Sequence, residues 1–169
     1  MPDDDTARAD EIVTFWETAR ARARIGRLPV VTGVGVAAAI PPPAWSFGDS
    51  PDLADALLGL VLAGRKTATA STVAELEAAG EPVPRVGDLS IVLDGGGHPR
   101  ALIRTTAVEV VPMGGVTAAF AASEGEGDGS LESWRSDHTR YWRRTLAGTG
   151  IEVDDALPVV CETFEVLYP

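Results

Sequence analysis

The segment that decides the fold reads Gly64-Arg65-Lys66-Thr67-Ala68-Thr69, and it follows a stretch with strong helix signals. Ser50 is a typical N-cap residue, and Pro51 suits the first helical position. Leucines follow at helical spacing, and Gly64 suits the left-handed turn that ends many helices. The sequence therefore predicts a buried helix that ends at Gly64 and presents the Arg-Lys-Thr segment at its exit.

Lys66 is the only lysine among 14 basic residues, since the other 13 are arginines. A lysine can lose its proton when it is desolvated and can then act as a base, whereas an arginine cannot. Thr69 lies three residues further on and could serve as a nucleophile beside it. The plain structural interpretation is a helix C-cap followed by solvated cations and hydroxyls, and the chemistry of these residues alone favours it.

The composition limits the classes of function. The 169-residue chain carries 25 acidic residues and a net charge of −11, which excludes a generally basic nucleic-acid coat. Residues 65–144 are the least acidic part, with 9 basic and 11 acidic side chains. A single cysteine, Cys161, excludes an intrachain disulfide and fits a reducing compartment. We therefore expect a small basic cleft at most.

The sequence also predicts a soluble, cytoplasmic protein. The first residues, Met1-Pro2-Asp3-Asp4-Asp5, are acidic, where a secretory signal would be basic and then apolar. The longest uncharged stretch, 28–48, is interrupted by glycines and three consecutive prolines. Its apolar centre, 30–40, is too short to span a membrane as a helix.

Hydrophobic periodicity predicts the remaining elements. An amphipathic helix is expected over 9–24, with Ile12, Trp16, Ala19 and Ala23 on one face, followed by an extended piece and a proline-stiffened connection over 26–45. A short helical segment around 76–79, a strand over 89–94, a hairpin turn at 94–97, and strands over 101–111 and 160–168 come next. Short strands with helices inserted between them predict an α+β or small β-barrel domain.

A helix is expected over about 130–146, between the last two strands. Its apolar face carries Leu131, Trp134, His138, Tyr141 and Trp142. Arg135 borders that face, whereas Arg140, Arg143 and Arg144 point away from it. The aromatic residues could stack on bases, but helical spacing favours core packing for at least two of them.

Metal chemistry has weak support. One cysteine and two unsuitably spaced histidines exclude a zinc site. The acidic run 124–129 resembles half of a calcium loop, but the position that needs a bidentate Glu is Arg135, which excludes an EF-hand. We predict no metal or other cofactor, and a weak magnesium site in this run remains as an alternative.

These residues resemble the ASCH domain family. The resemblance rests on Phe47-Gly48-Asp49, the helix to Gly64, the segment 65–69, Val86-Gly87-Asp88, and the run 124–128 with Trp134 and His138. It covers residues 45–168, and the longer ASCH proteins are similar in having a leading helix. It implies a PUA-like small β-barrel with flanking and inserted helices, and a ligand cleft between the barrel and the helices. It divides the chain into 1–44, a helix and connection packed on the domain, and 45–169, the ASCH domain.

The same resemblance implies a role in RNA or modified-nucleoside metabolism. The family includes ribonucleases for single-stranded RNA and amidohydrolases that deacetylate N4-acetylcytidine. It assigns catalysis to Lys66, Thr69 and either Glu126 or Glu124, in a loop whose length differs from the family's. Ligand contacts would come from Arg65, Thr67, Phe47, Trp134, Arg135 and His138.

The sequence thus predicts a hydrolase that cleaves single-stranded RNA around Lys66. The first alternative is an amidohydrolase in which Lys66 is the base, Thr69 the nucleophile and Glu126 the proton donor. The second is a non-catalytic RNA-binding module. The longer chain favours the ribonuclease by resemblance, whereas the net charge of −11 favours a nucleoside substrate.

Overall fold

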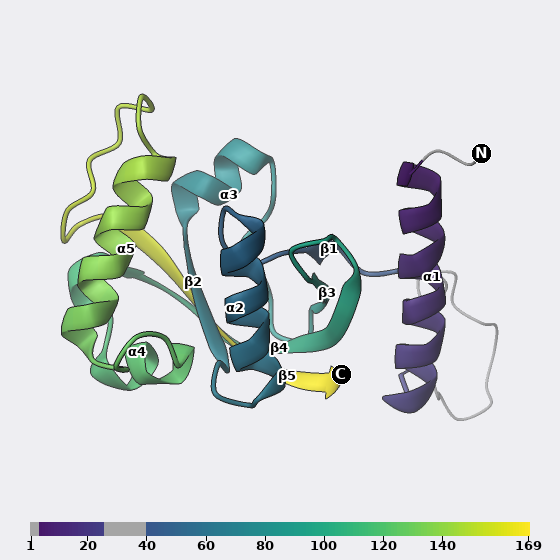
Figure 1. Cartoon of the computed structure of the whole chain (residues 1–169). Helices are drawn as coiled ribbons and strands as arrows, with labels where there is room; N and C mark the ends of the chain where they lie inside the picture. The colour runs from purple at the N-terminus through teal and green to yellow at the C-terminus, as the bar shows by residue number, and fades with distance from the viewer. Residues whose placement is uncertain (1–3, 26–39) are drawn as a thin grey trace. The chain divides into compact units, whose positions relative to one another are not determined.

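Figure 1 shows a computed structural model of the chain, which describes residues 4–25 and 40–169. The chain divides into two compact units. The first unit contains residues 1–62, 89–104 and 166–169, and the second contains 63–88 and 105–165. Most of the connection expected over 26–45 lies outside the described residues.

The strands confirm the predicted α+β class. They pair in the order β1-β3-β4-β5-β2. Strand β1 is parallel to β3, whereas β3 pairs with β4 and β2 pairs with β5 in antiparallel fashion. This order does not return to its start, so the described ladders form an open sheet. The strand bounds are β1 Ala44–Trp45, β2 Ala68–Thr72, β3 Leu89–Leu93, β4 Pro99–Pro112 and β5 Pro158–Tyr168.

The predicted helices are present in the expected order, with shifted ends. The helix expected over 9–24 begins at Asp4, and the one expected over 130–146 spans 131–145. The described helices are α1 Asp4–Arg22, α2 Pro51–Leu62, α3 Val73–Ala79, α4 Ala118–Glu124 and α5 Leu131–Thr145, with a short 3-10 helix at Met113–Gly115. None of the described helices combines the length and the hydropathy that a membrane span would require.

The first unit is centred on the predicted apolar face of α1. Trp16 and Ala19 are buried, and they cluster with Ile91 of β3 and Leu102 of β4. Ile12 and Ala23 pack against the same cluster, so all four residues expected on this face lie where the period places them.

Helix α2 begins and ends as predicted but is less buried than expected. The Leu53 amide donates to Ser50 Oγ at 3.3 Å, and Gly64 adopts a left-handed φ of 69° just beyond the helix. Only Ala54, Leu58 and Val61 are buried, whereas Leu62 is 42% exposed. The prediction of a buried helix therefore holds for one face only, because residues spaced i, i+4, i+7 provide the burial.

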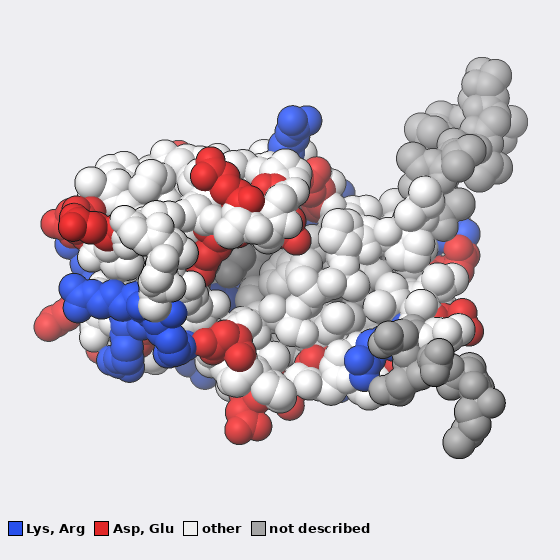
Figure 2. All heavy atoms as spheres, turned by 90° about the horizontal axis from the view of Figure 1, so that it is seen from above, with Lys and Arg blue, Asp and Glu red and all other residues white. Residues whose placement is uncertain are grey.

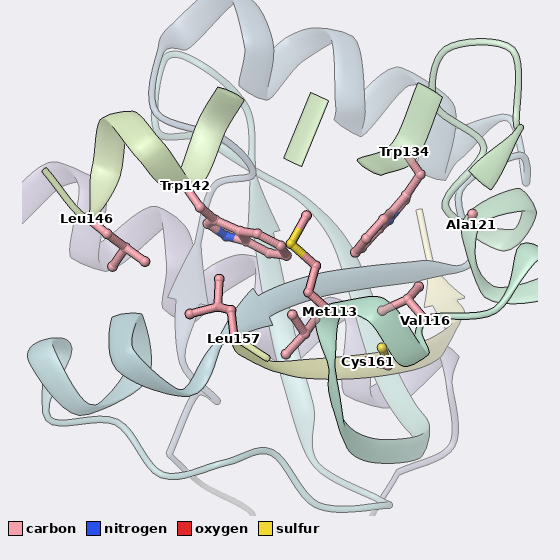
Figure 3. Packing of buried hydrophobic residues seen from close by; sticks show 9 residues of the cluster. Met113, Val116, Ala121, Trp134, Trp142, Leu146, Leu157 and Cys161 are labelled. Carbon is pink, nitrogen blue, oxygen red and sulfur yellow. The ribbon is translucent and has the colours of Figure 1, made fainter. Parts of the chain in front are cut away.

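The second unit has its core under α5 (Figure 3). Trp134 and Trp142 project from α5 towards Met113 and Leu157, with Cys161 of β5 in the same cluster. Both tryptophans are buried, which confirms the expected apolar face of this helix. Large aromatic side chains contribute much of the apolar area removed from water.

Strand β2 and helix α4 were not predicted from the sequence. Strand β2 has the sequence Ala-Thr-Ala-Ser-Thr, in which alanine and serine carry a weak strand signal. It forms because all five residues pair with β5, from Ala68 opposite Thr163 to Thr72 opposite Val159. Helix α4 contacts both β2 and α5 in the second unit (Figure 1).

Candidate functional site

Lys66 is enclosed by two glutamates at the start of β2. Its Nζ lies 3.0 Å from Glu124 Oε2 and 2.5 Å from Glu126 Oε1. The side chains of Lys66 and Glu124 are each 1% exposed, whereas that of Glu126 is 31% exposed. The structure thus brings together the predicted lysine and both candidate glutamates, and Glu126 is the member that solvent reaches.

Glu124 is held from its other side by two residues of α5. Trp134 Nε1 donates to Glu124 Oε1 at 2.6 Å, and His138 Nε2 lies 3.5 Å from the same oxygen. The rings of Trp134 and His138 stack with centroids 4.1 Å apart. His138 Nδ1 lies 2.9 Å from the Trp134 carbonyl, so it carries a proton, because a carbonyl only accepts. Of the predicted ligand residues, Trp134 therefore holds Glu124 by a hydrogen bond, and His138 lies beside the same carboxylate.

Backbone contacts fix the lysine segment against the end of α4. The Thr67 amide donates to the Ser123 carbonyl at 2.8 Å, and the Thr67 hydroxyl donates to the same oxygen at 3.2 Å. Helix α4 ends at Glu124, and the capping residue Gly125 has a left-handed φ of 67°. A Cβ on Gly125 would lie 2.2 Å from the Arg65 carbonyl oxygen. Close packing at this glycine therefore sets Glu124 and Glu126 on either side of Lys66.

The cluster carries an excess of negative charge. One ammonium faces two carboxylates, and His138 adds a positive charge only when it is protonated. Buried charges are retained in proteins when they are paired and hydrogen-bonded, as these are. The hydrogen-bonded groups run from Trp134 through Glu124 and Lys66 to the half-exposed Glu126.

The side chain of Thr69 points to a different group of residues. In the β2–β5 ladder Thr69 lies opposite Glu162, and Ala70 lies opposite Cys161. Cys161 and Ala70 belong to the core under α5, so Thr69 and Glu162 share the opposite face of these strands. The predicted role of Thr69 as a nucleophile activated by Lys66 stays a prediction.

Glu162 is a half-buried carboxyl that sequence reasoning missed. Thr105 Oγ1 donates to Glu162 Oε1 at 2.6 Å, and Thr105 is buried. Burial raises the pKa of Glu162, the Thr105 hydrogen bond offsets part of this, and the charge of Asp88 raises it further. The sequence did offer a signal for this carboxyl. Glu162 lies between Val160 and Phe164 on one face of the strand, and a carboxylate is unusual between two apolar residues.

The other predicted ligand residues are distributed more widely. Arg65 and Thr67, which flank Lys66 in the chain, are exposed. Arg135 donates to the Gly114 carbonyl at 2.8 Å and lines an open hollow on the outer side of α5. Phe47 is buried in the first unit, where its ring meets that of Trp45 edge-on at 4.7 Å. Its predicted role in ligand binding stays a prediction.

Within residues 4–25 and 40–169, the structure contains no group of three or more His, Cys, Asp or Glu side chains suited to hold a metal ion. The alternative of a magnesium site in 124–129 has no further support from these side chains. The Asp128 carboxylate of that run accepts a hydrogen bond from the Ser130 amide at 2.9 Å, which fixes the turn just before α5.

The α+β fold and the buried lysine–glutamate cluster at the exit of a capped helix define a class of small domains. The model of the ASCH domain family matches residues 43–168, most of the chain. The chain belongs to the ASCH domain family.

Two solved structures are similar over nearly the whole chain. A crystal structure of an ASCH domain from Lactobacillus crispatus JV V101 has a TM-score of 0.79 and 29% identity, covering 95% of this chain and 96% of that one. A crystal structure of an Enterococcus faecalis V583 protein has a TM-score of 0.77 and 33% identity, covering 94% and 88%. The comparison with curated proteins found no match.

Replacing Lys66 with methionine should destabilise the fold strongly. Removal of the ammonium leaves Glu124 buried beside a second carboxylate, and breaking such a pair costs about 3–5 kcal/mol. Urea denaturation of Lys66→Met measures this loss. The double variant Lys66→Met/Glu124→Gln should recover part of it, because the amide is neutral. Equal stability of the wild type and Lys66→Met would contradict the buried ion pair.

Replacing Gly125 with alanine should displace the glutamate loop. The new Cβ meets backbone atoms and the residue needs a left-handed φ, so the steric clash adds about 1–3 kcal/mol to the conformational cost. Gly129→Ala is the matched control, because Gly129 has a φ of 75° and open space around its Cβ position. Its cost should be about 1–2 kcal/mol. Thermal unfolding of both variants tests this, and equal losses would rule out the close contact.

Replacing Glu162 with glutamine should change how stability depends on pH. A folded-state pKa above the unfolded value stabilises the protein below the unfolded pKa, and this contribution is lost as pH rises through the folded pKa. The wild type loses this contribution as pH rises, whereas Glu162→Gln has no such carboxyl to ionise. The unfolding free energy of Glu162→Gln, relative to that of the wild type, should therefore increase from pH 4 to pH 7. The exposed Glu81→Gln controls for the loss of one carboxylate. A constant difference between Glu162→Gln and the wild type would refute the raised pKa.

Proposed function

We propose that this ASCH domain is a hydrolase that cleaves an amide on the base of a modified nucleoside, of the N4-acetylcytidine type. One observation carries the proposal. Lys66 is buried and lies 3.0 and 2.5 Å from two carboxylates, the second of which is half-exposed. A lysine–glutamate pair at the edge of a buried network is suited to accept and return a proton.

The charge of the cluster favours a neutral substrate. A phosphodiester brings a further negative charge beside two carboxylates, and the Lys66 ammonium is already engaged by both of them. Electrostatic repulsion would therefore oppose an RNA phosphate at this position. An acylated base is uncharged and meets no such penalty. Geometry thus favours the amidohydrolase over the ribonuclease that the sequence ranks first.

The proposed proton route is short and balanced. A water molecule attacks the acyl carbon and gives a proton to the Lys66–Glu126 pair. The tetrahedral intermediate then collapses, the carbon–nitrogen bond breaks, and the pair returns the proton to the departing amine. Glu124, held by the Trp134 indole, keeps the lysine in position.

Cleavage of single-stranded RNA is the second candidate. What favours it is a row of arginines on α5, where Arg135, Arg140 and Arg143 line one hollow with two hydroxyl residues. Arginines recognise phosphate through paired hydrogen bonds. In that function Glu126 would help to deprotonate the attacking hydroxyl, with Arg65 and Lys66 opposing the charge on the phosphate.

We also propose a cytoplasmic location and a boundary near residue 44 between the leading helix and the ASCH domain. The acidic composition and single cysteine support the first, and the resemblance over 45–168 supports the second.

The test compares hydrolysis of two substrates. The wild type should release acetate and cytidine from N4-acetylcytidine, while a short single-stranded RNA in a parallel tube stays intact. Glu126→Gln should lower nucleoside turnover by about 10²- to 10⁴-fold, the usual contribution of an acid–base group. Product formation is followed by chromatography.

Glu132→Gln is the matched control, because Glu132 is an exposed carboxylate in the first turn of α5. It should keep wild-type turnover, and both variants should keep the wild-type melting temperature within a few degrees. RNA cleavage that disappears in Glu126→Gln, without nucleoside turnover, would establish the ribonuclease instead. If neither substrate reacts, a binding module becomes the better account.

A further inference from the structure

His138 lies beside the lysine–glutamate cluster and has no step in the proposed proton route. Its Nε2 lies 3.5 Å from Glu124 Oε1, which is within the range of an ion pair but longer than a hydrogen bond. The His138 side chain is 13% exposed, so protons reach it from solvent. The chain has two histidines, and the other, His98, is paired with Glu11 in the first unit. His138 is therefore the imidazole whose charge bears on the cluster.

The contacts of the His138 ring fix its neutral tautomer. Nδ1 lies 2.9 Å from the Trp134 carbonyl, and because that oxygen only accepts, Nδ1 carries a proton. In neutral imidazole the other ring nitrogen is a bare acceptor. Nε2 of neutral His138 therefore turns a lone pair towards a carboxylate oxygen of Glu124, and two electron-rich atoms face each other. A second proton, on Nε2, replaces this repulsion with an attraction between opposite charges.

The groups packed around the ring do not change their own charge with it. The rings of Trp134 and Trp142 lie with centroids 4.1 and 5.0 Å from that of His138, and an indole does not titrate. Burial raises the pKa of the Cys161 thiol, in the same core as the two tryptophans, to about 12, so the thiol stays neutral at physiological pH. A proton on His138 therefore acts on Glu124.

Exposed charges act on the ring far less than Glu124 does. Figure 2 shows acidic and basic side chains at several places on the surface, in contact with solvent. Asp137, next to His138 in α5, is 51% exposed and lies 3.4 Å from Arg140. Water and salt screen charges of this kind. Glu124 is 1% exposed and lies against Lys66, so its charge is not screened in this way.

We propose that His138 is a positioning residue that sets the charge of the cluster through Glu124. While His138 is neutral, one ammonium and two carboxylates give the cluster a net charge of −1, and a proton on Nε2 brings it to zero. This inference rests on the proposed function, in which the Lys66–Glu126 pair takes a proton from water. A more negative cluster takes that proton more readily, so neutral His138 is the active form.

The pH dependence of nucleoside turnover tests the role of His138. An imidazole changes its charge between pH 5 and 8. As pH is lowered through this range, kcat of the wild type on N4-acetylcytidine should fall by about tenfold, because a neighbouring charge changes the proton affinity of a group by that factor or more. His138→Gln cannot gain a second proton, so its kcat should lack this step. KM should change little, because His138 acts through Glu124 and the substrate is uncharged.

His98→Gln is the matched control, because it removes the other histidine, whose side chain is 55% exposed. It should keep the wild-type pH profile of kcat. Both variants should keep the wild-type melting temperature within a few degrees. A wild-type pH profile in His138→Gln, or an equal change of profile in the two variants, would overturn the role of His138.

Nuclear magnetic resonance tests the contact between His138 and Glu124 without any substrate. Two-bond proton–nitrogen spectra distinguish a protonated ring nitrogen from a bare one, and the signals lost in His138→Gln identify this ring. In the neutral ring the proton should be on Nδ1. Glu124→Gln removes the facing carboxylate, so the ring should need an about tenfold higher proton concentration to gain its second proton. Asp137→Asn removes an exposed carboxylate beside the ring and should leave this proton uptake unchanged.

The two experiments separate this inference from the proposed reaction. A neutral ring with its proton on Nε2, or equal effects of Glu124→Gln and Asp137→Asn, overturns the inference, with or without nucleoside turnover. Absence of nucleoside turnover together with the expected spectra overturns the proposed reaction alone and leaves the coupling of His138 to Glu124 in place.

Discussion

The buried ammonium of Lys66 is the constraint on which the rest of the site depends. An ion removed from water must be paired and hydrogen-bonded, and Lys66 meets this requirement with Glu124 and Glu126 at 3.0 and 2.5 Å. Glu124 is itself buried, so it needs the Trp134 indole and the nearby His138. One lysine thereby links the start of β2, the end of α4 and the first half of α5. The same pairing supplies groups that can exchange protons.

Such a cluster specifies a geometry more than it adds stability. Replacing buried ion pairs with apolar residues is often neutral or stabilising, so the ion pairs by themselves are weak evidence for stability. What the cluster does supply is a proton donor and acceptor at fixed positions, with Glu126 half-exposed at the end of the network. Gly125 serves the same end, since its lack of a side chain lets the loop approach the Arg65–Lys66 backbone.

Charge is distributed over α5 in opposite senses. One side of the helix supports the lysine–glutamate cluster through Trp134, whereas Arg135, Arg140 and Arg143 line a hollow elsewhere on it. Glu162 and Thr105 lie on a separate strand face. The pKa of Glu162 is raised because the effect of burial on its carboxyl exceeds that of the hydrogen bond from Thr105.

The sequence by itself determined the elements whose signals are local. The cap at Ser50, the turn at Gly64, the apolar face of α1 and the aromatic face of α5 follow from spacing and side-chain chemistry, and the Lys66 segment was recognisable from its sequence. Only the tertiary structure decided that β2 is a strand, because its alanines and serine gain order from pairing with β5. It also decided that Glu124 and Glu126 both reach Lys66, about 60 residues away, and that Thr69 lies opposite Glu162. Contacts between distant segments depend on strand register and on the packing of whole elements, which local spacing does not encode.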